Sequence, residues 1–346
     1  MVLAGFRKLF SETSQYHIWE RMHASTMNQI LQQLGLLGIV PVVTIEDAGN
    51  AEPLAQVLID GGLPCAEVTF RTSAAQESMK RMAKAFPSML LGAGTVLTVE
   101  QVKRAVDSGG QFVVSPGLDR TVVEYCVRNG ITVTPGVITP TEIQVALELG
   151  LDVVKFFPAE ASGGLAYLKA VSAPYRQVWF IPTGGIDESN VVQYLKSSRV
   201  LACGGSWMVR ADLISARRFD EIRKHVEQAV AGMLGFQMIH LGINNANAAE
   251  AEQLAALLSR LLHLPVKGGD SSLFVGTQFE FLKQQYLGGH GHIAIGTNFI
   301  ERAVAHLARL GINVKDETKV QHDGKLVTVY LDTEVGGFAI HLRQME

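Results

Sequence analysis

The sequence predicts a (β/α)8 TIM barrel followed by a smaller α+β domain. From residue 38, short runs rich in β-branched residues alternate with amphipathic helical patterns, and the strand starts are about evenly spaced. Eight such βα units fill about 200 residues, a length that is compatible with a (β/α)8 barrel. The alternative is a doubly wound open sheet, but no Gly-X-Gly-X-X-Gly follows the first strand.

The elements follow in order along the chain. The predicted strands of the barrel are 38–45, 65–71, 90–96, 112–116, 132–137, 153–157, 178–182 and 200–203. The clearest predicted helices between them are 51–59, 74–85, 100–108, 122–129, 140–149 and 190–195.

Residues 1–26 precede the first periodic pattern. Charges interrupt every apolar run in this segment, so we expect no signal peptide. Met27 opens a short amphipathic helix in which Ile30, Leu31 and Leu34 share one face. We therefore interpret residues 1–26 as a poorly ordered extension and Met27 as the natural start, with residues 27–234 forming the barrel.

Composition narrows the class of protein. The 346 residues are 47% hydrophobic and 18% charged, which is enough material for about two domains with real cores. The net charge of −3 gives no reason to expect nucleic acid or a membrane as a partner. Three scattered cysteines without a Cys-X-X-Cys pair favour a reducing, cytoplasmic location. The absence of an 18-residue apolar run argues against a membrane span.

Lys155 lies in the middle of a short apolar run that ends at Pro158. One interpretation is a lysine at an exposed strand edge, with its ammonium group reaching water. The other is a desolvated, neutral amine that can form a Schiff base with a carbonyl carbon. Because a buried, unpaired ammonium is costly, the second interpretation requires a partner elsewhere in the barrel.

Glu67 is the candidate partner. It shares one strand face with Thr69 and Arg71, because side chains alternate with a period of two. One interpretation is that Glu67 forms an ion pair with Arg71 and has only a structural role. A carboxylate that faces Lys155 across the barrel mouth would instead shuttle protons during catalysis.

Glycine pairs end the last two barrel strands. Pro182-Thr-Gly-Gly185 closes the seventh and Gly204-Gly-Ser-Trp207 closes the eighth. Each pair alone is compatible with an ordinary tight turn. Together they predict a phosphate site, since this barrel binds phosphate after its seventh and eighth strands.

Six motifs in unbroken order resemble the class I 2-keto-3-deoxy-6-phosphogluconate (KDPG) and 4-hydroxy-2-oxoglutarate aldolases. The motifs are Glu67-Val-Thr-Phe-Arg-Thr72, Gly92-Ala-Gly-Thr-Val96, Ser115-Pro-Gly117, Val154-Lys-Phe-Phe-Pro-Ala-Glu160, Pro182-Thr-Gly-Gly185 and Gly204-Gly-Ser-Trp207.

The resemblance implies a role for each matching residue. Lys155 would form the Schiff base and Glu67 would be the general acid and base, while Arg71 and Thr95 would bind the pyruvyl carboxylate. The rest of the implied substrate-binding set comprises Thr183, Gly184, Gly185, Gly205 and Ser206. The resemblance also implies a small 2-keto acid substrate, no metal or organic cofactor, and a homotrimer.

The pattern changes near Gly235, where a domain of residues 236–346 begins. Each half reads as β-α-β-β, with or without a further strand, and the two halves resemble the paired modules of the glyoxalase-like, or vicinal-oxygen-chelate, fold. His240-Leu-Gly-Ile matches His292-Ile-Ala-Ile, and Phe279-Glu-Phe-Leu matches Ala339-Ile-His-Leu.

The positions that hold metal ligands in that fold are His240, Glu280, His292 and His341 here, although glutamate is more usual in the last place. They form either a divalent cation site or ordinary strand residues of a metal-free domain. His290 is a poor candidate, because it lies in a loop.

The sequence leaves the role of the C-terminal domain open. It is either an accessory of the aldolase, for oligomer contacts or regulation, or a second metal-dependent or small-molecule-sensing unit. A barrel that binds sugar acids without catalysis is a further alternative, against which Lys155 and Glu67 argue. The sequence also does not separate the gluconate from the galactonate epimer of the substrate.

Overall fold

The computed structural model describes residues 28–345, so the predicted extension 1–26 and the proposed start at Met27 lie outside the described residues. The described chain divides into two compact units, one ending at Met233 and the other beginning at Leu234. Each unit is described separately below. None of the helices in residues 28–345 is long and apolar enough to cross a membrane.

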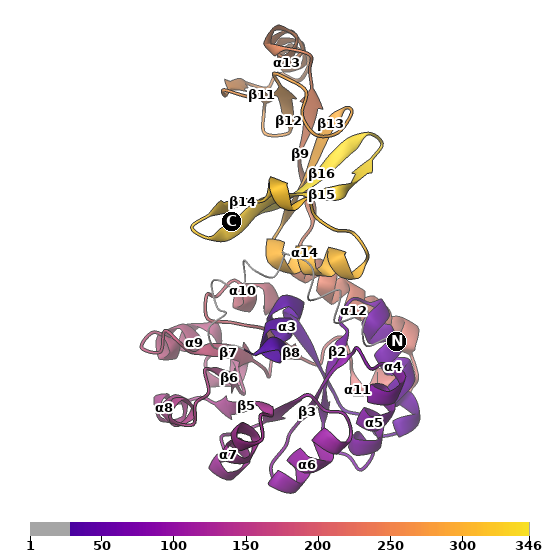
Figure 1. The fold of residues 1–346 in the computed structure, drawn as a ribbon, viewed down its shortest axis with the longest axis vertical. Coiled ribbons are helices and arrows are strands. Elements are labelled where there is room, and N and C mark those ends of the chain that lie inside the picture. Colours follow the sequence, from indigo (N-terminus) through magenta and orange to yellow (C-terminus); the bar gives the residue numbers. More distant parts are fainter. Residues whose placement is uncertain (1–27, 346) are drawn as a thin grey trace. The chain divides into compact units, whose positions relative to one another are not determined.

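The first unit is an almost closed barrel of eight parallel strands, drawn in indigo to pink in Figure 1. The strands pair in the order β7-β6-β5-β4-β3-β2-β1-β8, and the bridges Phe180–Val200 and Thr183–Gly204 join β7 to β8. The strands are β1 Ile39–Val43, β2 Cys65–Thr69, β3 Leu90–Gly94, β4 Phe112–Ser115, β5 Thr132–Val137, β6 Val153–Phe156, β7 Trp179–Pro182 and β8 Cys203–Gly205. All eight predicted strands are therefore present, although the last begins three residues later than expected.

Helices α4 to α9 form a ring around the strands (Figure 1). Val102 and Ala105 are buried in α6, for example, whereas the charged residues of the same helix face solvent. The helices are α3 Gln29–Leu37, α4 Ala51–Asp60, α5 Ala75–Ala85, α6 Val99–Asp107, α7 Arg120–Arg128, α8 Pro140–Glu148, α9 Gly164–Ser172, α10 Val191–Leu195, α11 Ala211–Ser215 and α12 Phe219–Leu234, with 3-10 turns η2 Ala48–Asn50 and η3 Glu160–Ser162.

Helix α3 closes the amino-terminal end of the barrel. The side chain of Asn28 accepts a hydrogen bond from the backbone N–H of Leu31, which caps the helix, and its amide donates to Thr132 Oγ1 at the start of β5. Leu34 is 1% exposed and lines the barrel interior. The amphipathic helix that the sequence predicts after Met27 therefore covers the amino-terminal end of the barrel. The functional groups face the opposite, carboxyl end of the strands.

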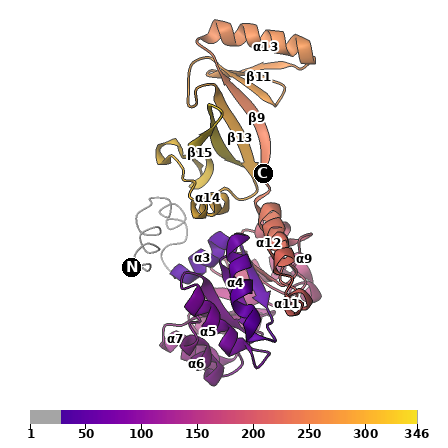
Figure 2. The same cartoon turned by 90° about the vertical axis from the view of Figure 1, so that its right-hand side faces the viewer.

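The second unit contains one eight-stranded mixed sheet, drawn in orange to yellow in Figure 2. Its strand order is β10-β11-β12-β9-β13-β16-β15-β14. The elements are β9 Gln237–Asn244, α13 Ala248–Leu262, β10 Val266–Gly268, β11 Ser272–Val275, β12 Phe279–Leu282, β13 Gly291–Thr297, α14 Ile300–Arg309, η4 Asp316–Thr318, β14 Val320–His322, β15 Lys325–Val335 and β16 Phe338–Gln344.

The sheet consists of two β-α-β-β-β modules joined by an antiparallel pairing of β9 with β13. In each module the first strand pairs in parallel with the last, β9 with β12 and β13 with β16. Leu273, Val275 and Phe281 pack with α13 in a small apolar core on one face. Each module contains the further strand that the sequence left open. These strands, β10 and β14, are short and exposed and carry no apolar alternation that would predict them.

Candidate functional site

Lys155 and Glu67 meet inside the barrel. Lys155 lies on β6 and Glu67 on β2, and the Lys155 Nζ to Glu67 Oε1 distance is 3.2 Å. The residues are only 6% and 4% exposed, respectively. Lys155 therefore does not lie at an exposed strand edge, and its ammonium group has the carboxylate partner that burial requires.

Two glycines of β3 make room for this pair. A Cβ atom on Gly94 would lie 2.3 Å from Oε1 of Glu67, and one on Gly92 would lie 2.1 Å from the ring of Phe112. Glycine lets the neighbouring side chains occupy space on the inner face of the barrel. Glycine is therefore needed at positions 92 and 94, because the side chains of Phe112 and Glu67 fill the space that a larger residue would occupy.

Proton transfer is possible between the two groups. Lys155 Nζ donates to Glu67 Oε1 within hydrogen-bond distance, which is the reach that a general acid or base needs. The Lys155 amine also lies 5.1 Å from the ring centroid of Phe157, so this ring covers one side of it. Phe156 is fully buried and stacks on Tyr167 at 6.1 Å, which is a core-packing role.

A small cavity adjoins the pair. Its volume is about 10 Å³, which is close to the space that a single water molecule needs. It is lined by Leu34, Val40, Glu67, Phe112, Val114, Thr134, Lys155, Ile181 and Thr183. The lining is mostly apolar, so charges there are poorly solvated and interact strongly.

Arg71 lies beyond the carboxyl end of β2 and is exposed. Its Nε donates to Thr95 Oγ1 at 3.0 Å, and Thr95 has a positive φ of 57° just after β3. Glu67 hydrogen-bonds with Lys155, so the alternative of a structural Glu67–Arg71 ion pair is not the arrangement found. The Arg71 guanidinium is left at the barrel mouth, where its planar fork suits a carboxylate.

The glycine loops after β7 and β8 are neighbours, because Thr183 pairs with Gly204. Gly184 and Gly185 have φ angles of 93° and 78°, which favour glycine. Their backbone N–H groups have no hydrogen-bond acceptor among residues 28–345. Gly205 is buried and Ser206 is exposed at the end of β8. Free N–H groups and small residues of this kind can bind an anion.

Glu160 and Tyr194 support this loop, and sequence reasoning did not assign a role to either. The backbone N–H of Glu160 donates to the carbonyl of Gly184 at 3.1 Å, and Tyr194 Oη donates to Glu160 Oε1 at 2.5 Å. Burial, and then the hydrogen bond and charge of Glu160, raise the pKa of the Tyr194 hydroxyl. The position of Glu160 at the end of the Lys155 motif was the available signal for it.

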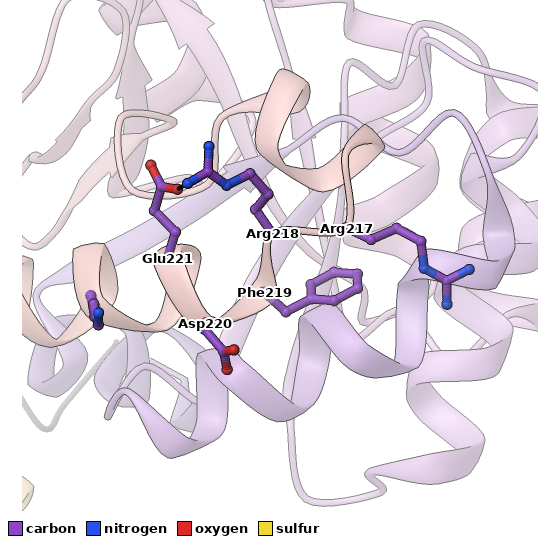
Figure 3. Close-up of a pocket in the computed structure, with 6 residues that line it drawn as sticks. Arg217, Arg218, Phe219, Asp220 and Glu221 are labelled. Carbon is purple, nitrogen blue, oxygen red and sulfur yellow. Dashed lines mark ion pairs between the residues drawn. The ribbon is translucent and has the colours of Figure 1, made fainter.

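A wider hollow of about 530 Å³ lies elsewhere on the first unit, at the start of α12. Figure 3 shows its lining residues Arg217, Arg218, Phe219, Asp220 and Glu221, with an ion pair between Arg218 and Glu221. It contains none of the predicted catalytic residues. The hollow is lined largely by solvated charges and is not the candidate site.

The second unit brings its four candidate ligands together. His240, Glu280, His292 and His341 come from β9, β12, β13 and β16, and the three imidazoles are buried. The ligand atoms of the three histidines all lie within 4.8 Å of one another. His290 is exposed and packs against Phe338, outside this cluster.

The sequence matches the family described as KDPG and KHG aldolase over residues 30–225. The chain belongs to this family. Among curated relatives, the 2-dehydro-3-deoxy-phosphogluconate aldolase of Treponema pallidum is 48% identical over 204 residues, which are 59% of this chain and 97% of the relative. The KHG/KDPG aldolase of Escherichia coli is 40% identical over 194 residues, 56% of this chain and 91% of that protein.

Solved structures agree with the sequence match. A KDPG aldolase from Legionella pneumophila, captured with pyruvate as a covalent carbinolamine intermediate, covers 58% of this chain and 98% of its own, with 36% identity and a TM-score of 0.57. The barrel unit is therefore that of an aldolase, a carbon–carbon lyase. The family match ends at residue 225, so the second unit lies outside it.

Proposed function

We propose that the barrel cleaves 2-dehydro-3-deoxy-6-phosphogluconate reversibly to pyruvate and glyceraldehyde 3-phosphate. The observation that carries this proposal is the buried contact of 3.2 Å between Lys155 Nζ and Glu67 Oε1, at the centre of a barrel whose relatives are named for this substrate. Because one relative is also named for KHG, 4-hydroxy-2-oxoglutarate is a second substrate in this proposal, giving pyruvate and glyoxylate.

Lys155 supplies the covalent step. Its uncharged amine attacks the 2-keto carbon, and Glu67 gives a proton to the carbinolamine hydroxyl, which leaves as water. The resulting protonated imine accepts the electron pair of the breaking C3–C4 bond. The mostly apolar surroundings of Lys155 and the ring of Phe157 keep competing water away from this nitrogen.

Glu67 supplies the proton transfers. As a carboxylate, directly or through one water, it removes the proton of the C4 hydroxyl while the C3–C4 bond breaks, which releases the aldehyde and leaves an enamine on Lys155. The same proton then returns to C3 of the enamine. Water then hydrolyses the imine, which releases pyruvate and restores the free amine of Lys155.

The two ends of the substrate meet different groups. Arg71 and Thr95 bind the carboxylate next to the ketone, since they form a polar pair at the barrel mouth. The phosphate binds near Thr183, Gly184, Gly185, Gly205 and Ser206, where the backbone N–H groups of Gly184 and Gly185 are available within the described chain. This end favours the phosphorylated gluconate substrate.

Three broader proposals complete the function. We assign residues 27–234 to the aldolase barrel, which needs no metal or organic cofactor, and residues 236–346 to a glyoxalase-like accessory domain. The support for the latter is the pair of β-α-β-β-β modules joined at β9 and β13.

We also propose that the protein is a cytoplasmic homotrimer, and light scattering of the purified chain tests the trimer.

The test of the aldolase proposal is the release of pyruvate from KDPG by the wild type and by Glu67→Gln. Glutamine keeps the size of the side chain but cannot shuttle a proton, so we expect kcat to fall by about 10²- to 10⁴-fold. Glu77→Gln, on the exposed face of α5, is the matched control and keeps wild-type activity. A wild type that leaves KDPG intact, or a Glu67→Gln variant as fast as the wild type, contradicts the proposal.

A further inference from the structure

Four side chains of the second unit converge on one point. His240 Nε2 and His292 Nε2 are 3.0 Å apart, and each lies 3.2 Å from Glu280 Oε2. His341 adjoins them, with its ring centroid 4.9 Å from that of His292. The exposures of His240, His292 and His341 are 5%, 3% and 6%, so the cluster is shielded from solvent.

With Glu280 as a carboxylate, no placement of protons on the two imidazoles satisfies every contact among His240, Glu280 and His292. If both Nε2 atoms carry a proton, both donate to Glu280 Oε2, but two N–H groups then face each other at 3.0 Å. If one Nε2 is bare, its lone pair faces the carboxylate oxygen at 3.2 Å. A buried group of three mutually close polar atoms with one repulsive contact is costly, and a cation at its centre removes that cost.

His341 adds a fourth potential ligand. Neither of its ring nitrogens has a hydrogen-bond partner among the described residues, although the residue is only 6% exposed. A buried imidazole without a hydrogen-bond partner, next to three converging ligand atoms, is suited to bind a metal ion.

The distances fit a transition-metal ion. Two ligand atoms about 2.1 Å from one cation lie about 3.0 Å apart at a right angle and about 3.4 Å apart at the tetrahedral angle. The three observed separations of 3.0 to 3.2 Å fall in this interval. Three imidazoles and one carboxylate suit Zn²⁺, Ni²⁺, Co²⁺ or Fe²⁺ better than Ca²⁺ or Mg²⁺.

The strand register shows that the site is built symmetrically from both modules. His240 lies two residues before Gly242, which pairs with Glu280, and His292 lies two residues before Ala294, which pairs with His341. Each module therefore contributes one histidine from its first strand and one ligand from its last strand at equivalent positions. Side chains alternate along strands, so all four lie on one face, opposite the apolar core with α13.

Two neighbours hold the ligands in place. Ser272 Oγ donates to Glu280 Oε1 at 2.6 Å, which turns Oε2 toward the histidines. Gly242 leaves space for His292, since a Cβ atom there would lie 2.1 Å from Cε1 of the ring.

We propose that His240, Glu280, His292 and His341 form a binding site for one divalent transition-metal ion in the second unit, separate from the metal-independent aldolase chemistry of the barrel.

The test is zinc binding by the full chain, expressed without a polyhistidine tag. The protein is stripped with a chelator and titrated with zinc sulfate in a calorimeter, and retained metal is counted by mass spectrometry. We expect one Zn²⁺ per chain, and we expect tight binding to be lost in Glu280→Gln and in His341→Gln. His322→Gln, whose side chain is 80% exposed on β14, is the matched control and binds like the wild type.

Gly242→Ala provides a second test that changes none of the four ligand residues. The added methyl group displaces His292, so we expect zinc affinity to fall by about tenfold or more. Gly289→Ala is the control, because a Cβ there meets nothing closer than 3.7 Å. The proposal is overturned if the stripped wild type binds no zinc in the titration. It is also overturned if the ligand variants and Gly242→Ala bind zinc as the wild type does, which would indicate an adventitious cation only.

Discussion

At the scale of single residues, the site depends on space as much as on charge. Lys155 and Glu67 form a buried pair, and the side chain of Glu67 occupies the volume that Gly94 leaves empty. The chemistry needs the carboxylate within hydrogen-bond reach of both the amine and the substrate hydroxyl. The residues that carry no functional group therefore constrain the reaction geometry as firmly as the residues that react.

The variant Gly94→Ala tests this constraint. A Cβ atom at that position would lie 2.3 Å from Glu67 Oε1, so the carboxylate must move, and we expect kcat for KDPG cleavage to fall by about 10²-fold. Gly117→Ala is the control, because a Cβ there has nothing within 4 Å. Steady-state kinetics on both variants check the prediction, and equal loss in both would contradict it.

The contact between Lys155 and Glu67 was predictable from the sequence, because a lysine buried in an apolar strand requires a partner of opposite charge. The supporting contacts were not. Tyr194 and Glu160 are 34 residues apart, and no local pattern indicates that the hydroxyl of one reaches the carboxylate of the other. Such contacts depend on the curvature of the barrel and on side-chain packing, which short-range periodicity does not encode.

At the scale of elements, side-chain caps mark the starts of four barrel helices, α3, α6, α7 and α8. Helix α8 begins with a capping box in which Thr139 Oγ1 accepts from the backbone N–H of Glu142, and the Glu142 carboxylate accepts from the backbone N–H of Thr139. Pro140 occupies the first helical turn, where its missing N–H costs nothing. Strong local signals of this kind explain why the predicted helix 140–149 is nearly the one observed.

Thr139→Ala measures the capping box. We expect the free energy of unfolding, from urea titration, to fall by about 1 kcal/mol. Thr141→Ala, at an exposed position of the same helix, is the control and is neutral or slightly stabilising, since alanine favours helix. A loss as large in Thr141→Ala as in Thr139→Ala would contradict the assignment.

The effect of Thr139→Ala also depends on pH. Burial raises the pKa of Glu142, but hydrogen bonds with Thr139 and Ile138 outweigh it and hold the pKa below its ordinary value. The stabilisation is complete above the unfolded carboxyl pKa of about 4.3 and is lost as the pH falls through the lower folded pKa. The difference between wild type and Thr139→Ala therefore shrinks in acid.

The C-terminal elements show where sequence patterns stop being reliable. The β-α-β-β order that the sequence predicts for each half of this unit is present. The repeat alignment was wrong by one residue in the second pair of strands, because the register places Glu280 opposite Gly242 and His341 opposite Ala294. Four-residue apolar matches do not fix register in a sheet, where side-chain contacts across neighbouring strands decide it.

At the scale of the whole molecule, the chain contains a complete family barrel and an additional unit. The match to the Treponema pallidum aldolase spans 97% of that relative but 59% of this chain. A barrel of this length is thus a whole protein elsewhere. The fold of the barrel was predictable because eight units repeat one pattern, whereas the second unit offered only short matches, which left the further strand of each half open.

Truncation after Leu234 tests the independence of the barrel. We expect the shortened chain to keep the pyruvate-releasing activity of the full protein, because every predicted catalytic and substrate-binding residue precedes that point. The measurement is kcat/KM for KDPG on both chains, with circular dichroism to confirm folding. A folded but inactive barrel would show that the second unit contributes to catalysis.

The most direct test of the central claim is borohydride trapping with pyruvate, followed by intact mass measurement and peptide mapping. Reduction of the imine fixes pyruvate on the amine that formed it, so we predict one adduct per chain at Lys155 and none in Lys155→Ala. Lys169→Ala, at an exposed position of α9, is the matched control and forms the adduct as the wild type does. The absence of an adduct in the wild type, or its location at another lysine, would contradict the proposed Schiff-base mechanism.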